Sequence, residues 1–276
     1  MLGRMYSEGR GVTQDNEQAE YWFRKEIEKV VDLEFGGDWK KALGAQYCEI
    51  GEMYKYSVGE AEQNDELALY WLRKAAEQGD ASGQWELGDM YSKGQGVECD
   101  HEQAAYWYHK AGEHDYAWRQ YQLGSMHYNG HDVDQNDEQA VYWFRKSAEQ
   151  GNKDAQNSLG AMYEDGTGVS QDYEEAVKWY QLAADQGHAR AQFNLGYMYR
   201  NEKGVPQNYK EAVKWYRLAA DQGNVEAQFE LGEMYSDGLG VEKNIELAVN
   251  WFRKAAELGS FEAQETLKKL NIDRKE

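Results

Sequence analysis

The strongest constraint on the fold is a sequence pattern that recurs seven times along the chain. Each copy contains Leu-Gly or a close variant, at Leu2-Gly3, Ile50-Gly51, Leu87-Gly88, Leu123-Gly124, Leu159-Gly160, Leu195-Gly196 and Leu231-Gly232. From Gly88 to Gly232 the spacing is always 36 residues, and a Met lies two residues after every one of these glycines. A stack of similar units needs the same contacts in every layer, whereas a catalytic site needs one residue at one place. The pattern therefore predicts a repeat architecture.

The copy at residues 155–187 shows how one unit is expected to fold. Its first half has apolar residues at helical spacing, namely Ala155, Leu159 and Tyr163. Its second half has a second apolar stripe, namely Ala176, Trp179, Tyr180, Ala183 and Ala184. Gly166 can adopt a positive φ and end the first helix, and Gly187 ends the second. Each unit is therefore predicted to be helix, loop, helix and turn.

Polar caps mark the start of every second helix. Asp172 and Glu175, three residues apart, form a capping box. The equivalent residue is Asp or Asn in all seven copies, at Asp15, Asn64, Asp100, Asn136, Asp172, Asn208 and Asn244. The glycine-rich loop between the helices is thus interpreted as a bend rather than as a phosphate-binding loop.

Gly160 lies inside the first predicted helix, where glycine costs about 1 kcal/mol relative to alanine. The same cost recurs in all seven copies, so a compensating contact is expected in each. A Trp also recurs 19 or 20 residues after this glycine in every copy, and in this copy it is Trp179. We expect close approach of the neighbouring helix, with this repeat Trp across from the glycine.

Across residues 155–187 the sequence reads Ala-x-x-x-Leu-Gly-x-x-Tyr-x-x-Gly-x-Gly-Val-x-x-Asp-x-x-x-Ala-x-x-Trp-x-x-x-Ala-Ala-x-x-Gly. This pattern resembles the Sel1-like repeat family, whose fold is similar to that of tetratricopeptide arrays. The expected fold is all-α, a right-handed superhelical solenoid of about seven helix-turn-helix repeats of 36 residues, forming one domain over residues 1–276. The repeats are expected to begin near residues 1, 45, 81, 117, 153, 189 and 225, with an irregular insertion over 26–45 and a C-terminal capping helix over 261–270.

Several copies depart from the pattern. The loop reads Ser57-Val-Gly-Glu-Ala61 in the second copy, Gly130-His-Asp132 in the fourth and Glu202-Lys-Gly204-Val-Pro206 in the sixth. The second helix of the first copy is expected to run on to about Phe35, and Trp39 is expected in the core of the insertion. The chain begins too late for the first turns of its opening helix, so we expect a truncated N-terminus.

Charge and composition narrow the range of partners. The net charge is −20 and the pI is about 4.7, which disfavours nucleic acid and anionic membrane surfaces and favours a partner with basic patches. No apolar run approaches 18 residues, so membrane insertion is not expected. No signal peptide is recognisable in the sequence. The protein is therefore expected to be soluble, and either cytoplasmic or, if an upstream signal peptide is missing, periplasmic or secreted. It is also expected to be a monomer. Cys48 and Cys99 are expected to be reduced thiols, without an assigned role.

No catalytic, cofactor or metal motif stands out in the sequence. Ser-x-x-Lys, Lys-Thr-Gly, His-Glu-x-x-His, Cys-x-x-Cys, Gly-x-Gly-x-x-Gly and the P-loop motif are all absent. Five histidines cluster in sequence, at His101, His109, His114, His127 and His131, and scattered surface histidines are favoured there over a metal site. We therefore expect no enzymatic activity, no catalytic residues, no cofactor and no metal.

Recognition is expected where the copies differ. On the first helix, positions −6, −2, +1 and +5 relative to the glycine form one stripe, which by analogy with similar solenoids should line the concave groove. The predicted partner-binding residues on this stripe are Tyr56, Trp118, Gln122, Asn129, Arg190, Asn194, Tyr197, Asn201, Glu226, Glu230 and Glu233. Trp118 is singled out as an anchor, with packing on the neighbouring turn near His114 as the favoured alternative.

The resemblance implies a protein–protein interaction scaffold or adaptor, bacterial, with a role in host interaction or envelope complexes. The mechanism would be docking of a peptide, loop or domain on the stripe, with the acidic end steering basic groups. One alternative is a structural spacer in a larger envelope protein, and a cell-wall or β-lactam hydrolase is the least favoured reading.

Overall fold

The computed structural model describes residues 39–57, 63–114 and 116–270, together with Asp15, Gln18, Ala19, Tyr21, Trp22 and Lys25. Within these ranges the chain forms thirteen helices and no strand, so the all-α prediction is confirmed. The long second helix predicted for the first copy and the side chain of Trp39 lie outside the described residues.

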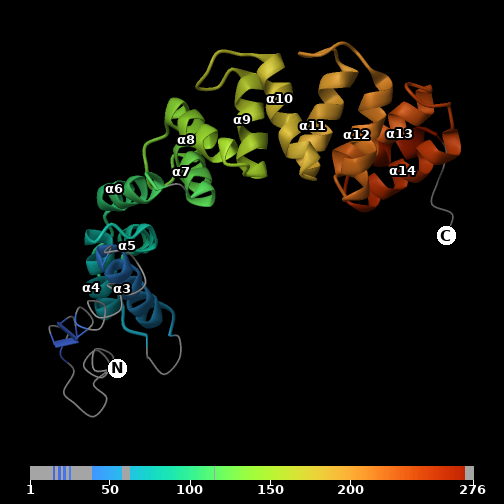
Figure 1. The fold of residues 1–276 in the computed structure, drawn as a ribbon. Coiled ribbons are helices and arrows are strands. Elements are labelled where there is room, and N and C mark those ends of the chain that lie inside the picture. Colours follow the sequence, from blue (N-terminus) through green and yellow to red (C-terminus); the bar gives the residue numbers. More distant parts are fainter. Residues whose placement is uncertain are drawn as a thin grey trace. The chain divides into compact units, whose positions relative to one another are not determined.

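The helices fall into two compact units (Figure 1). The first unit contains α3 (Trp39–Tyr56), α4 (Asp65–Glu77), α5 (Ala81–Lys93) and α6 (His101–Gly112), together with the loop 130–134. The second contains α7 (Ala117–Asn129), α8 (Asp137–Glu149), α9 (Lys153–Asp165), α10 (Tyr173–Asp185), α11 (Ala189–Arg200), α12 (Tyr209–Asp221), α13 (Val225–Asp237), α14 (Ile245–Glu257) and α15 (Phe261–Lys269). The single domain predicted over residues 1–276 stays a prediction.

Within each unit, every helix packs against the helices that precede and follow it, as the predicted helical hairpins require (Figure 1). In the hairpin of α9 and α10, the buried residues are those of the two apolar stripes, including Leu159, Tyr163, Tyr180 and Ala183. Trp179 was predicted to be buried with them, but it is only partly buried at the edge of this core. The helical-hairpin repeat is thereby confirmed in its main features.

The predicted Asp and Asn caps are present wherever the structure describes them, but the capping box is not: the Asp172 backbone N–H donates to the Tyr163 carbonyl oxygen, and Glu175 pairs with Lys178 instead. The Asp172 carboxylate accepts hydrogen bonds from the backbone N–H groups of Glu174 and Glu175, both at 3.0 Å. Gly166 ends α9 with φ 72°, the left-handed conformation that favours glycine. A second set of caps was not foreseen: the first helices begin behind Asp80, Asn152, His188, Asn224 and Ser260.

The contact opposite Gly160 differs from the prediction. A Cβ atom added at Gly160 would lie 2.7 Å from Cδ1 and Cε1 of Tyr180, the residue after Trp179. The same relationship joins Gly88 to Tyr108, Gly124 to Phe144, Gly196 to Tyr216 and Gly232 to Phe252. The helices approach closely as expected, but the ring at the contact belongs to the residue that follows the repeat Trp.

The second loop glycine also has a packing role. A Cβ atom at Gly168 would overlap the backbone of Asp137, the first residue of α8, and Gly204 is related to Tyr173 in the same way. The loop thus lies against the start of the preceding second helix, which supports its interpretation as a bend.

Helix α3 begins at Trp39, inside the region predicted to be irregular until residue 45. It is 18 residues long, and Leu43 and Tyr47 are fully buried on the same face as Ile50 and Tyr54. The apolar stripe of the second copy therefore starts one turn earlier than the repeat spacing suggests, because Leu43 extends it.

Candidate functional site

The predicted stripe residues have different environments in the structure. Six are exposed, namely Tyr56, Trp118, Asn129, Arg190, Asn201 and Glu226, whereas five are half-buried, namely Gln122, Asn194, Tyr197, Glu230 and Glu233. Trp118 is 56% exposed on the first turn of α7. All of them except Tyr56 belong to the second unit.

Several stripe residues are already engaged between consecutive first helices. The amide nitrogen of Asn194 on α11 donates to the side-chain oxygen of Asn157 on α9 at 3.2 Å. Glu230 on α13 forms an ion pair with Arg200 on α11. These residues connect neighbouring repeats, so part of their polar capacity is used within the protein.

Tyr56 in the first unit is held in the same manner. Its hydroxyl donates to Glu86 Oε2 at 2.7 Å, and the same carboxylate oxygen accepts from Lys55 Nζ, also at 2.7 Å. Burial and the neighbouring carboxylate of Glu86 raise the pKa of Tyr56 to about 12. Lys55 additionally pairs with Asp89 at 3.0 Å, and its side chain is only 2% exposed. At this end of the stripe the polar groups of Tyr56, Lys55 and Glu86 are bonded to one another, although the Tyr56 side chain remains exposed.

The acidic residues of the seventh copy are partly neutralised. Glu226 lies 3.7 Å from the guanidinium of Arg190, and Glu230 is paired with Arg200. Glu233 and Asp237 complete this acidic face, the former half-buried and the latter exposed on α13. The predicted all-acidic end therefore retains negative charge but also carries two arginines from the preceding copy.

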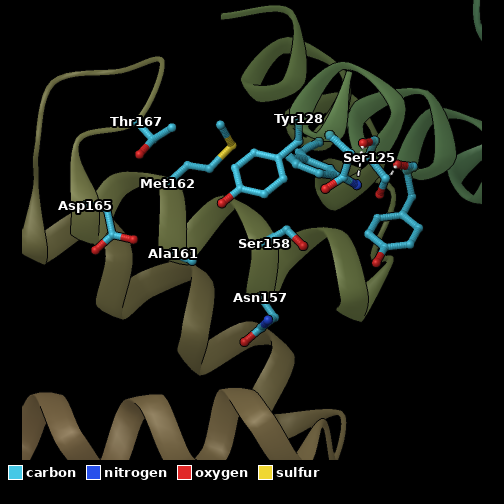
Figure 2. A pocket seen from close by; sticks show the side chains of 11 residues that line it. Ser125, Tyr128, Asn157, Ser158, Ala161, Met162, Asp165 and Thr167 are labelled. Carbon is cyan, nitrogen blue, oxygen red and sulfur yellow. Dashed lines mark hydrogen bonds between the residues drawn. The ribbon is translucent and has the colours of Figure 1, made fainter. Parts of the chain in front are cut away.

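A pocket of about 290 Å³ opens on the stripe between α7 and α9 (Figure 2). It is lined by Tyr121, Ser125, Tyr128, Asn129, Phe144, Asn157, Ser158, Ala161, Met162, Asp165 and Thr167. Of the residues predicted at the site, only Asn129 lines this pocket. The pocket lies wholly inside the second unit.

The pocket exists because the fourth and fifth copies carry small residues at stripe positions. Ser158 stands where the third and seventh copies have Glu86 and Glu230, each of which forms an ion pair with a Lys or Arg of the preceding first helix. Ala161 stands where the sixth copy has Tyr197. With both side chains short, a hollow remains beneath Tyr128.

The walls of the pocket combine apolar and polar surface. In Figure 2 the ring of Tyr128 extends over the hollow toward Met162, and Ser158 lies near this ring on α9. Asp165 is exposed at the rim, on the last turn of α9, and no described residue forms an ion pair with it. Such a site suits a side chain with an apolar stem and a cationic head, which is how Lys and Arg pack on proteins.

The polar groups on the α7 side are fixed by their own helix. Ser125 Oγ donates to the carbonyl oxygen of Tyr121 at 3.1 Å, and Asn129 Nδ2 donates to the carbonyl oxygen of Ser125 at 2.9 Å. Because the Asn129 side-chain nitrogen is already bonded to its own helix, the side-chain oxygen of Asn129 is the atom available to accept a hydrogen bond. The titratable residues of the lining are Tyr121, Tyr128 and Asp165.

The sequence reasoning missed Tyr128, Asn157, Ser158, Ala161 and Asp165. The signal was available for three of them, because positions −2, +1 and +5 of the fifth copy are Ser158, Ala161 and Asp165. Ser158 and Ala161 are small and therefore did not stand out as binding residues, although small residues leave room for a ligand.

Two further findings concern functions other than protein binding. Among the described residues, no group of three or more His, Cys, Asp or Glu side chains is placed to hold a metal ion. Among the helices of the described ranges, none combines the length and apolar composition that crossing a bilayer requires.

Comparison with known proteins gives consistent matches to one family. The family model of the Sel1 repeat matches residues 1–25, 47–80, 81–116, 120–152, 153–188, 189–224 and 225–260. A comparison with the curated proteins gives no match.

Two solved structures are similar over nearly the whole chain. One is c5321, a protective antigen present in uropathogenic Escherichia coli strains and displaying an SLR fold, with 37% sequence identity and a TM-score of 0.78 over 98% of this chain. The chain spans 56% of the length of that protein. The other is a Sel1 repeat protein from Oxalobacter formigenes, with 32% identity and a TM-score of 0.63, covering 98% of this chain and 74% of that one.

Sel1 repeat proteins generally mediate protein–protein interactions and are typically scaffolds rather than enzymes. The seven matched segments and the helical hairpins agree with the 36-residue pattern of the sequence. The chain belongs to the Sel1 repeat family.

Proposed function

We propose that the second unit binds an extended segment of a partner protein along its first helices, with a Lys or Arg side chain of that segment in the pocket between α7 and α9. The observation that carries this proposal is the pocket itself, which lies on the stripe where the copies differ. Family membership supports protein binding in general, and the pocket supports the choice of surface.

The charge of the chain supports a basic partner. The net charge is −20, and Asp165 stands at the rim of the pocket. On the same stripe, Glu226, Glu233 and Asp237 would attract further cationic groups. Electrostatic complementarity of this kind accelerates association and selects among partners more than it adds raw affinity.

Trp118 and Tyr197 supply aromatic area on the same stripe. Trp118 is 56% exposed, and Tyr197 is half-buried with Lys203 Nζ 4.8 Å from its ring centroid. Aromatic side chains of this kind are frequent binding anchors. We propose that they contact the partner on either side of the pocket.

The similarity to a protective antigen of uropathogenic bacteria supports a bacterial origin and a role at the interface with a host or in an envelope complex. This part of the proposal concerns the whole protein, of which the chain covers little more than half in that relative.

Selection from a random peptide library against the full chain tests the proposal. We expect the selected peptides to be enriched in Lys and Arg and to lose affinity as the salt concentration rises, because surface charges are screened. Selection of acidic or purely apolar peptides, or of none, would contradict it.

A further inference from the structure

A thiol, an imidazole and a carboxylate follow one another at one loop of the first unit. Cys99 Sγ is 3.5 Å from His101 Nε2, and His101 Nδ1 is 3.0 Å from Asp132 Oδ1. Cys99 precedes α6, His101 is the first residue of α6, and Asp132 belongs to the loop 130–134 of the same unit. The order of these groups is that of a nucleophile, a base and the residue that orients the base.

Asp132 departs from the repeat pattern at a position that favours glycine. The equivalent residues are Gly96, Gly168, Gly204 and Gly240, all with positive φ. Asp132 keeps this conformation, with φ 61°. At the equivalent glycines a Cβ atom would overlap the first residue of the preceding second helix, which in the fourth copy is His101. The carboxylate therefore occupies a strained and crowded place, as is frequent at functional sites.

The contacts of Asp132 orient the imidazole of His101 and set the tautomer of its neutral form. The Asp132 side chain is 6% exposed, and Oδ1 accepts from Ser92 Oγ at 2.9 Å, while Oδ2 lies 2.8 Å from His131 Nδ1. A carboxylate only accepts hydrogen bonds, so Nδ1 of His101 carries the hydrogen. Nε2 of the neutral ring is then the acceptor, and it faces Cys99 Sγ.

The two cysteines have opposite environments. Cys99 is exposed, and its thiol donates to the carbonyl oxygen of Ser92 at 3.1 Å in the resting arrangement. Cys48 is 4% exposed, and its thiol donates to Glu52 Oε1 at 3.6 Å. Burial, together with the charges of Asp80 and Glu52, raises the pKa of the Cys48 thiol far above its ordinary value. Cys48 thus serves as an unreactive internal reference.

We propose that Cys99 is a thiol–disulfide exchange site for small cationic disulfides. His101 Nε2 accepts the thiol proton, and Cys99 Sγ attacks one sulfur of the disulfide. The S–S bond of the small molecule breaks as the new S–S bond to Cys99 forms, and the departing thiolate leaves as a thiol with the proton from His101. The small disulfide is itself the oxidant, so no other co-reactant is needed.

The charges around Cys99 favour a positively charged disulfide over a negatively charged one. A hollow of about 560 Å³ opens beside His101, His131 and Asp132, and Glu102 and Asp134 also line it. The charged and titratable residues of the segments that meet at this loop are Asp89 and Lys93 of α5, Glu98 and Asp100 of the connecting segment, His101 and Glu102 of α6, and His131, Asp132 and Asp134 of the loop. Lys93 is paired with Asp89, so acidic groups predominate.

The test measures mixed-disulfide formation on the full chain by intact mass, with cystamine as the cationic probe and glutathione disulfide as the anionic one. The rate of the protein with each disulfide is divided by the rate at which the model thiol N-acetylcysteinamide reacts with the same disulfide. This ratio removes the difference between the two leaving groups. At pH 7 we expect modification of Cys99 alone, with a normalised cystamine rate roughly tenfold or more above unity. The glutathione disulfide rate should be lower.

Two variants separate this role from a structural one. His101→Gln is at a 63% exposed side chain and should fold normally, with the cystamine rate falling about tenfold. Asp132→Gly restores the glycine of the other copies, so it should keep or raise Tm while lowering the rate. If both variants keep the normalised rate of the unmodified chain, or if glutathione disulfide reacts faster than cystamine, the proposal is wrong.

Discussion

The Cα atom of Gly160 on α9 lies against the ring of Tyr180 on α10, and a methyl group on this Cα would be 2.7 Å from two ring carbons. Glycine accordingly stands at this position in all seven copies, although alanine is the better helix former. The contact sets how closely the two helices of one repeat approach, and through them how the repeats stack.

Replacing this glycine should therefore destabilise the second unit. Gly160→Ala gains about 1 kcal/mol of helix propensity but forces the Tyr180 ring to move, and we expect a net loss of about 1–3 kcal/mol in the free energy of unfolding. Urea denaturation followed by circular dichroism measures it. Gly151→Ala is an unsuitable control because Gly151 has φ 89°. Ala161→Gly in the same helix measures the propensity term together with the loss of one partly buried methyl group. A stability equal to or above that of the unmodified chain in Gly160→Ala would refute the close-contact explanation.

Asp172→Ala should cost about 1 kcal/mol, because two backbone N–H groups at the start of α10 lose their acceptor. Asp172→Asn is the matched control, since Asn stands at this cap in four other copies and its oxygen accepts the same bonds. Thermal unfolding compares the two variants. Equal losses in both would show that charge, rather than the hydrogen bond, is what the cap contributes.

The stability of the first unit should depend on Asp89 in a pH-dependent manner. Burial opposes ionisation of Asp89, but hydrogen bonds and charges from Lys93 and Lys55 outweigh it and hold its pKa below the ordinary value. A lowered pKa contributes stability that is present above the ordinary pKa near 4 and is lost as the pH falls through the folded value. Asp89→Asn should therefore cost about 1–2 kcal/mol at pH 7, and the difference from the unmodified chain should shrink toward pH 3.

Unfolding by urea at pH 7, 5, 4 and 3 checks this. Glu86 keeps Lys55 paired in the variant, which limits secondary effects. A difference that stays constant over this range would mean that ionised Asp89 does not stabilise the fold.

A binding role and a spacer role predict different effects of substituting Trp118 and Tyr197, the two aromatic residues of the stripe. Trp118→Ala and Tyr197→Glu change side chains that are exposed and half-buried, so Tm should stay within a few degrees of the unmodified chain. If the stripe binds a partner, each variant should lower the affinity for a selected peptide by tenfold or more. A structural spacer would show no peptide binding for these variants to weaken.

The repeat period, the caps and the all-α fold could be predicted from the sequence because they rest on local spacing. Asp172 and Gly166 act within a few residues, so their roles are visible in one copy and verified by the others. Repetition also argues against a ligand site at the glycine loop. Gly168 packs on Asp137 in the same way that Gly204 packs on Tyr173, so the loop has the same packing role in both copies.

Contacts that depend on the geometry of stacking were harder to predict. Trp179 and Tyr180 are adjacent on the helix, and which of them meets Gly160 depends on the angle at which α9 and α10 cross. Similarly, Glu230 was predicted to face a partner, but Arg200 reaches it from the preceding repeat. A helical stripe defines a face of one helix, and it does not say which neighbour covers that face.

The candidate pocket was missed for a related reason. It results from an absence of bulk at Ser158 and Ala161, and bulky residues draw attention in a sequence more readily than small ones. Comparing the copies position by position reveals it, because Glu230 and Tyr197 occupy the same places in later copies.

The most direct measurement is the affinity of a library-selected basic peptide for a matched pair of variants in the fifth copy. Ala161→Tyr places in the pocket the residue that the sixth copy has at this position, Tyr197. Lys178→Tyr adds the same side chain on α10, where the fourth copy has the exposed Tyr142. By isothermal titration calorimetry we expect Ala161→Tyr to weaken binding at least tenfold and Lys178→Tyr to leave it unchanged. Equal affinity in Ala161→Tyr and the unmodified chain would contradict the assignment of the pocket as the binding site.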